Sequence, residues 1–291
     1  MSTLVYTQFT DGLVTEIKAH LRNPNRPRPN IMNRFAFTHR NNRVYHERKE
    51  VVPQSKVDDY LRVLMYSPKS TAPLSRDSLH KYCADKYWGI SRRAIMRFLQ
   101  AQPSYTKLAK RPPKDKGDAR FFQSYKGLLG VDIVYLDKEA YPPKFLPTPT
   151  GIAKKKHYVL TAVDALTHYA FVRYLGTSMG ARRVLANFKE IEKEYKKVFG
   201  YFPKIIASDR GSEFVNKEVW KPYMAKRGYG LQYVKLVAYV EQFNAQLQKT
   251  LVMLATGMRT GKKLSTVLPN AVKRCNNGHN MRMKRQIKTI H

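Results

Sequence analysis

Cysteine, acidic residues and long apolar runs are all scarce in this sequence, and each scarcity argues against a class of protein. The 291 residues include only two cysteines, Cys83 and Cys275, which excludes a disulfide framework and a four-cysteine zinc site. No stretch approaches about 18 consecutive apolar residues, so we expect no membrane-spanning helix and no membrane partner. We expect a reducing, intracellular environment.

The N-terminal residues lack the charged region and the apolar run that are typical of a secretory signal. Asp11 and Glu16 are also unusual for an organelle transit peptide. We therefore expect the nucleus, the cytoplasm or the mitochondrion, and the sequence does not choose among these compartments.

The chain has a large excess of positive charge. It contains 54 Lys and Arg against 21 Asp and Glu, a formal net charge of +33, so a compact chain repels itself unless a polyanion neutralises it. Nucleic acid, either DNA or ribosomal RNA, is the expected partner. Because 43% of the residues are hydrophobic, including 19 Tyr and 13 Phe, the chain can bury a core and is not a basic tail.

Composition and periodicity divide the chain into five segments. Residues 1–56 are expected to form an extended basic arm, because Arg is spread among Pro and Asn with little apolar periodicity from residue 21 onward. Residues 57–103 have helical periodicity and predict a small helical domain, and residues 104–126 predict a basic linker. Residues 127–258 are the expected core, and residues 259–291 a basic tail.

The small helical domain is compatible with a helix-turn-helix module that places a cationic third helix on nucleic acid. Ser91 is the expected N-cap of that helix, and Gly89 lies in the preceding turn. A helical bundle that only packs is an equally good interpretation. His80 and Cys83 have a ligand-like spacing, but no second pair follows, so the sequence argues against a zinc site.

Cationic residues of the arm, the third helix, the linker and the tail are the expected phosphate contacts, since guanidinium and ammonium groups bind phosphate. For the arm, a solvated linker is the alternative. The expected contacts are Arg22, Arg26, Arg28, Arg34, Arg92, Arg93, Arg97, Lys107, Lys110, Arg111, Arg282, Lys284 and Arg285.

The core alternates apolar strands and helices in an order that predicts an α/β fold, with a mixed five-stranded sheet and helices on both faces. Three strands come first and are followed by helix, strand, helix, strand and helix. The expected strands are 128–136, 157–163, 168–175, 203–208 and 231–237, and the expected helices are 180–199, 215–227 and 239–255.

Four motifs occur in the core in a fixed order: Gly130-Val131-Asp132, Tyr158–Asp164 continuing into His168–Val172, Ser208–Phe214, and Tyr239–Asn244. Together they resemble the catalytic core of retroviral-type integrases, most nearly those of Polinton/Maverick elements and related transposons. The resemblance covers roughly residues 126–280. It implies a ribonuclease-H-like fold and, for an active member, a DNA integrase or transposase.

The resemblance further implies that Asp132, Asp209 and Glu241 are the three catalytic, metal-binding carboxylates, holding Mg²⁺ or Mn²⁺. Hard oxygen ligands suit both ions, and two ions about 4 Å apart would assist both the attacking and the leaving oxygen of a phosphodiester. Two of the three carboxylates also have a structural alternative. Asp209 can cap its own turn, and Glu241 can be a first-turn helix glutamate. Asp132 lies among apolar residues, where burial is costly without a cation or a donor. Asp137 and Asp164 are interpreted as strand-end and turn residues.

The sequence departs from this family after Glu241, where cations usually follow. Gln242, Ala245 and Gln248 stand at those positions, and the 32 positions from Asp209 to Glu241 are a few short of the usual spacing. Two functions therefore remain open. One is an active DNA integrase, and the other is a catalytically inactive, domesticated integrase fold that serves as a structural RNA-binding subunit of a ribosome, for instance a mitochondrial one.

Overall fold

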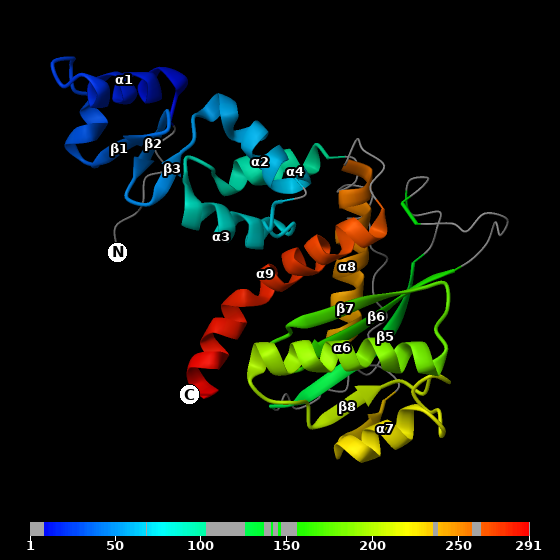
Figure 1. Cartoon of the computed structure of the whole chain (residues 1–291). Coiled ribbons are helices and arrows are strands. Elements are labelled where there is room, and N and C mark those ends of the chain that lie inside the picture. Colours follow the sequence, from blue (N-terminus) through cyan, green and yellow to red (C-terminus); the bar gives the residue numbers. More distant parts are fainter. Residues whose placement is uncertain are drawn as a thin grey trace. The chain divides into compact units, whose positions relative to one another are not determined.

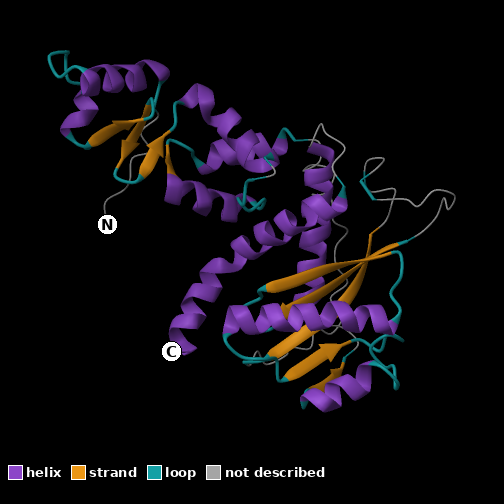
Figure 2. Cartoon of the chain, viewed as in Figure 1, coloured by secondary structure: helices purple, strands orange, loops and turns teal. Residues whose placement is uncertain are grey.

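The structure is a computed structural model that describes residues 9–67, 69–102, 126–136, 141, 145–146, 156–234, 238–257 and 263–290, without the side chains of 256–257 and 278–290. The chain divides into two compact units, Met1–Ala109 and Lys110–His291 (Figure 1, Figure 2). Within the described residues, no helix is long and apolar enough to cross a membrane.

The first unit combines a four-stranded sheet with four α-helices. The strand order is β1-β2-β3-β4, with the first two pairs antiparallel and the last pair parallel. Its elements are α1 (Asp11–Arg22), the 3₁₀ helix η1 (Asn30–Asn33), β1 (Phe37–Arg40), β2 (Arg43–His46), β3 (Lys49–Val51), η2 (Gln54–Lys56), α2 (Val57–Tyr66), α3 (Arg76–Lys86), β4 (Tyr87–Trp88) and α4 (Arg92–Gln100).

The prediction of an extended arm over residues 1–56 is wrong for its described part, which is folded. Val14 and Ile17 of α1 pack with Phe37 of β1 in a buried cluster. Asn41 and Asn42 join β1 to β2 with positive φ angles of 49° and 60°, the conformation that a tight two-residue hairpin requires. The Asn-Asn pair was the available signal, and the surrounding arginines obscured it.

The helices of residues 57–103 form as expected, but they are not a separate domain. The Ser91 side chain accepts a hydrogen bond from Ala94 N at 3.1 Å and caps α4 as predicted. Strand β4 joins these helices to the sheet of the preceding segment. Gly89 has a φ of +108°, and a Cβ there would lie 2.6 Å from Val52 O, so only glycine fits. The first 102 residues therefore contribute to one folded unit.

The second unit contains the predicted mixed five-stranded sheet, in the order β7-β6-β5-β8-β9. Strands β5, β6 and β7 are antiparallel neighbours, whereas β8 runs parallel to both β5 and β9. The elements are β5 (Leu128–Leu136), β6 (His157–Asp164), β7 (Ala170–Gly176), α6 (Ala181–Phe199), β8 (Ile205–Ser208), α7 (Trp220–Arg227), β9 (Gly230–Tyr233), α8 (Ala238–Gly257) and α9 (Leu264–Ile290).

Helices cover both faces of this sheet, as the alternation along β5 requires. Leu129 and Val131 pack in one cluster with residues of α6 and α7, such as Phe188. Val134 and Leu136 belong to a second cluster with α8 and α9. The core is therefore three layers deep, with β5 buried at its centre.

The predicted basic tail over residues 259–291 is also wrong, because Leu264–Ile290 forms the long helix α9. Leu264, Leu268, Ala271 and Cys275 are buried in the same cluster as α8. Their spacing is helical, and the cations near the C-terminus together with Pro269 hid it. The core therefore extends well beyond residue 258.

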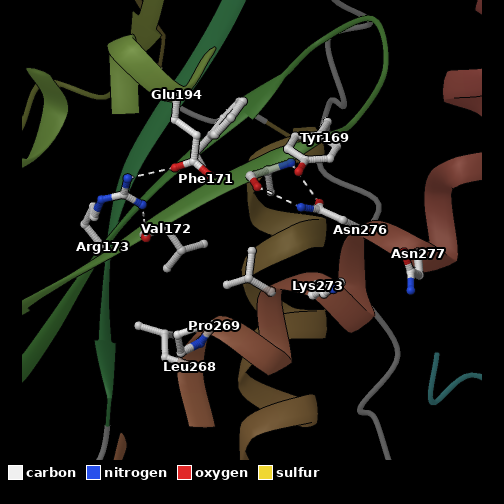
Figure 3. Close-up of a pocket in the computed structure, with 12 residues that line it drawn as sticks. Tyr169, Phe171, Val172, Arg173, Glu194, Leu268, Pro269, Lys273, Asn276 and Asn277 are labelled. Carbon is white, nitrogen blue, oxygen red and sulfur yellow. Dashed lines mark hydrogen bonds and ion pairs between the residues drawn. The ribbon is translucent and has the colours of Figure 1, made fainter. Parts of the chain in front are cut away.

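The edge strand β7 is held by a side chain of α9 (Figure 3). The Asn276 amide accepts from Ala170 N and donates to Ala170 O, both at 2.9 Å, and so pairs with the strand as a neighbouring strand would. A pocket of about 420 Å³ lies beside this contact, where Arg173 forms an ion pair with Glu194 at 2.7 Å.

One buried carboxylate, Glu192 of α6, joins α6 to α7 and to the start of β9. Its oxygens accept hydrogen bonds from Tyr223 at 2.6 Å, from Arg227 at 2.7 Å, and from Tyr229. Removing the carboxylate leaves three donors without their acceptor, one of them charged, in a poorly solvated site.

We expect Glu192→Ala to lower the free energy of unfolding by about 2–4 kcal/mol, because the three donors lose their acceptor. Urea denaturation measures the change. Glu190→Ala, on the same helix, removes an exposed carboxylate that pairs with Lys193 and should cost much less, because an exposed ion pair contributes little stability. Equal losses in the two variants would contradict this role of Glu192.

Candidate active site

The two aspartates of the candidate site lie on neighbouring parallel strands, one within its strand and the other directly after its strand. The β5–β8 pairing aligns Gly130 with Ala207, so Asp132 in β5 and Asp209 directly after β8 lie at the same level of the sheet. Glu241 belongs to the first turn of α8, whose N-terminus packs against the same strand. The topology thus gathers residues that the sequence separates by more than 100 positions.

Asp132 lies in an electrostatically negative environment. The pKa of its carboxyl group is raised to about 6, mainly by burial and in smaller part by the charges of Asp209, Glu241 and Glu213, while the hydrogen bond from Ile133 N partly opposes the rise. Mutual repulsion among these carboxylates favours either a proton or a bound cation. This is the environment expected of a cation site.

Both oxygens of Asp132 accept hydrogen bonds. Ile133 N donates to Oδ1 at 2.7 Å, and Asn244 Nδ2 donates to Oδ2, also at 2.7 Å. The Asn244 side chain is buried, and its Oδ1 has no hydrogen-bond partner in the part of the chain that the structure describes. Sequence reasoning gave Asn244 no role, although its position three residues after Glu241 places both on one side of α8.

Helix α8 follows β5 closely because Gly130 has no side chain. A Cβ at Gly130 would lie 2.5 Å from Val240 Cγ2 and 2.6 Å from Tyr239 Oη. Farther along the same helix face, Gln248 Nε2 donates to Tyr135 O at 3.2 Å. Gln248, at a position expected to face nucleic acid, therefore binds the backbone of β5.

Asp209 caps its own turn, which was the structural alternative to a metal-binding role: Gly211 N donates a hydrogen bond to Asp209 Oδ1 at 3.0 Å. The same turn holds the buried Glu213, whose carboxylate lies close to Gly211, since a Cβ there would lie 2.7 Å from Oε1. Glu213 is a fourth carboxylate near Asp132 that sequence reasoning missed, although it belongs to the Ser208–Phe214 motif.

The carboxylates do not converge as tightly as predicted. Within the described residues, no three His, Cys, Asp or Glu side chains approach closely enough to share a metal ion. The charge and the oxygen donors fit a divalent cation, and the free Oδ1 of Asn244 is a further neutral oxygen beside Asp132. The distances between the carboxylates must shorten before three of them can bind one ion.

Asp164 is a structural residue, as the sequence interpretation had it. Its carboxylate accepts from Thr167 N at 2.8 Å, from Thr167 Oγ1 at 2.7 Å and from Tyr195 Oη at 2.9 Å. These bonds close the turn between β6 and β7. Asp137 lies outside the described residues.

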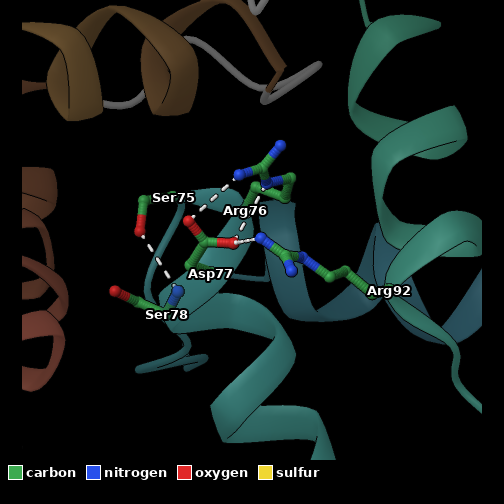
Figure 4. A network of polar contacts seen from close by, with 5 residues as sticks. All are labelled: Ser75, Arg76, Asp77, Ser78 and Arg92. Atoms are coloured by element: carbon green, nitrogen blue, oxygen red, sulfur yellow. Dashed lines mark hydrogen bonds and ion pairs between the residues drawn. The ribbon is translucent and has the colours of Figure 1, made fainter.

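Several of the cations expected to bind nucleic acid have partners within their own unit (Figure 4). Arg92 of α4 pairs with Asp77 at 2.7 Å, and Arg97 with Asp58 at 3.7 Å. Arg93 is exposed on α4 without a hydrogen bond or ion pair in the described residues. Of the three arginines, Arg93 is the one available to phosphate without breaking a contact.

In the segment that was expected to be an extended arm, two of the four arginines expected to bind phosphate form hydrogen bonds within the first unit. Arg22 Nη2 donates to Asn42 Oδ1 at 2.8 Å, and Arg28 Nη2 donates to Met32 O at 2.7 Å. Arg26 and Arg34 are exposed. The side chains of the remaining expected contacts lie outside the described residues, namely Lys107, Lys110, Arg111, Arg282, Lys284 and Arg285.

Comparison with known proteins identifies the same region. Residues 144–244 match the family model of the integrase core domain, a span that includes Asp209 and Glu241 and begins after Asp132. Similar solved structures include the HTLV-2 integrase catalytic core domain in complex with magnesium. Its dimeric form is 14% identical at a TM-score of 0.36, covering 50% of this chain and 82% of that chain. The trimeric form is 13% identical at a TM-score of 0.34, covering 51% and 81%. No curated protein matches the chain.

The strand order, the mixed strand directions and the helices on both faces are those that the motifs implied. The family model matches within the same unit. The second unit of this chain therefore has the expected α/β fold with a mixed five-stranded sheet, and residues 144–244 within it match the integrase core domain.

Proposed function

We propose that this protein binds nucleic acid through an integrase-type core in which Asp132, Asp209 and Glu241 hold Mg²⁺ or Mn²⁺. The observation behind the proposal is the negative environment of Asp132 inside a chain with a net charge of +33. A cation there would neutralise the carboxylates and attract a phosphodiester, whose leaving oxygen it can stabilise. DNA is the substrate class to which an integrase-type core is suited.

The chain's own residues supply the positioning. Asn244 holds the Asp132 carboxylate, and the close packing at Gly130 fixes the start of α8, and with it Glu241, against β5. The residues that would hold substrate phosphate are poorly suited to binding it. Gln242 and Ala245 are uncharged, and Gln248 is bonded to β5.

A second candidate function is a structural RNA-binding subunit without catalysis. It is supported by the two N–H donors on Asp132, which satisfy that carboxylate in the absence of a metal ion. The missing cations on α8 support it as well. Identifying the polynucleotide that co-purifies with the protein from its own cells distinguishes the two functions, since ribosomal RNA supports the second and element-end DNA the first.

We expect Mn²⁺ to raise the melting temperature of the wild-type protein, because an ion that binds only the folded state stabilises it. The rise should disappear in Asp132→Asn and remain in Glu218→Gln, which removes an exposed carboxylate of the same unit. Differential scanning calorimetry with and without Mn²⁺ measures it. A rise of the same size in Asp132→Asn would place the ion elsewhere.

We expect strand transfer to be weak or absent even with Mg²⁺ or Mn²⁺, because misplacing a phosphodiester by about 1 Å costs on the order of a hundredfold in rate. The assay uses DNA ends of integrase-bearing elements from the host and compares wild type with Asp132→Asn and Glu241→Gln. Robust activity that both substitutions abolish would overturn this expectation. Undiminished polynucleotide binding by the two variants would support the structural role.

The first unit is proposed to bind phosphate through the exposed face of α4, where Arg93 has no partner. We expect Arg93→Ala to weaken binding to all sequences and to reduce the slope of log affinity against log salt by about one. Lys193→Ala, which removes a lysine paired with Glu190, is the control. Fluorescence anisotropy at several salt concentrations gives both slopes, and an unchanged slope in Arg93→Ala would remove α4 from the interface.

A further inference from the structure

Two tyrosines lie side by side on the α6 face of the sheet, near the candidate site. Tyr135 of β5 pairs across the strands with Tyr158 of β6, and their ring centroids are 6.3 Å apart. Tyr135 is 42% exposed, although it is part of the central strand. The strand β8 ends at Ser208, opposite the middle of β5, so β5 has no β8 partner at Tyr135.

Two cations lie close to this tyrosine pair. Lys156 directly precedes β6, and its ammonium is 5.3 Å from the Tyr135 ring centroid. Tyr158 pairs with Gly176 of β7, where a Cβ would lie 3.1 Å from Nη2 of Arg183, a residue of α6.

These two cations differ from most of those described above. Neither Lys156 nor Arg183 forms an ion pair with an acidic side chain in the described residues, whereas Arg173 is neutralised by Glu194. Single exposed tyrosines are common on protein surfaces and need no explanation. Two adjacent aromatic rings with unpaired cations close by are a combination that suits single-stranded nucleic acid, with the bases on the rings and the phosphates on the cations.

The tyrosine pair also lies close to the candidate site along β5. Tyr135 is three residues beyond Asp132 on the same strand, about 10 Å away at the usual rise of a strand. Because side chains alternate, Tyr135 and Asp132 face opposite sides of the sheet. A bound strand that reaches both must cross from one face of the sheet to the other beside the part of β5 that has no β8 partner, and a flexible single strand can bend more sharply than a duplex.

We infer that Tyr135 and Tyr158 form a stacking platform for an unpaired base of the bound strand, with Lys156 and Arg183 holding the flanking phosphates. This inference rests on the proposed binding of nucleic acid and adds a preference for single strands. The platform binds the face of the base, which DNA and RNA share, so it has no preference between them.

The test measures binding of the full-length protein to single-stranded DNA, single-stranded RNA and duplex DNA of one sequence, each with 2-aminopurine as a reporter of stacking. Tyr135→Ala is expected to lose on the order of tenfold in affinity for single strands, together with the quenching of the reporter. Tyr135→Phe keeps the ring and should bind as wild type does. Duplex affinity should be unchanged in both variants.

Met179→Ala is the matched control, since Met179 is 40% exposed in the same unit and should not affect binding. If Tyr135→Ala binds single strands as tightly as wild type does, the platform is overturned. It is also overturned if the variant loses as much affinity for duplex DNA as for single strands. The proposed function stands in both cases. A loss in Tyr135→Phe equal to that in Tyr135→Ala also overturns it, because a hydroxyl contact would then explain the binding. A wild-type protein that binds none of the three probes overturns the proposed function as well.

Discussion

The close approach of α8 to β5 at Gly130 is the contact on which the rest of the candidate site depends. Because no side chain separates helix from strand there, one face of α8 follows β5, and Asn244 and Gln248 reach Asp132 and Tyr135. The two contacts are four residues apart on α8, about 6 Å, and three residues apart on β5, about 10 Å. A larger residue at Gly130 would displace Glu241 and Asn244 together.

The sheet was predictable because its signals are local, since apolar strands alternate with helices. The neighbouring positions of the two aspartates followed from the resemblance of the ordered motifs to integrases. The remaining features depend on contacts between distant residues. Asp132 and Asn244 are 112 positions apart, and neither residue alone indicates the hydrogen bond between them. An extended arm was expected in the first 56 residues because the surrounding charge outweighed the signal of a two-asparagine hairpin turn. A basic tail was expected in place of α9 because its cations and Pro269 obscured a helical apolar pattern.

Net charge indicates the kind of partner but not the place where it binds. Arg22, Arg28 and Arg92 all bond to atoms of their own unit, so part of the excess charge supports the fold. The exposed ion pair of Arg92 with Asp77 contributes little stability and can be exchanged for a contact with phosphate. Cations without a partner, such as Arg93, are better candidates, because phosphate binding there breaks no existing contact.

The neutral face of α8 follows from the same geometry. A cation at position 248 would lie where Gln248 donates to the Tyr135 carbonyl, on a part of β5 that has lost its β8 neighbour. Gln248 thus donates a hydrogen bond to the Tyr135 carbonyl, which has no partner on β8. This contact accounts for the glutamine at position 248, where integrases usually have a cation. Gln242 is exposed and has no such role. The lack of a cation at position 242 is therefore a stronger reason than the lack of one at position 248 to expect weak phosphate binding by this helix.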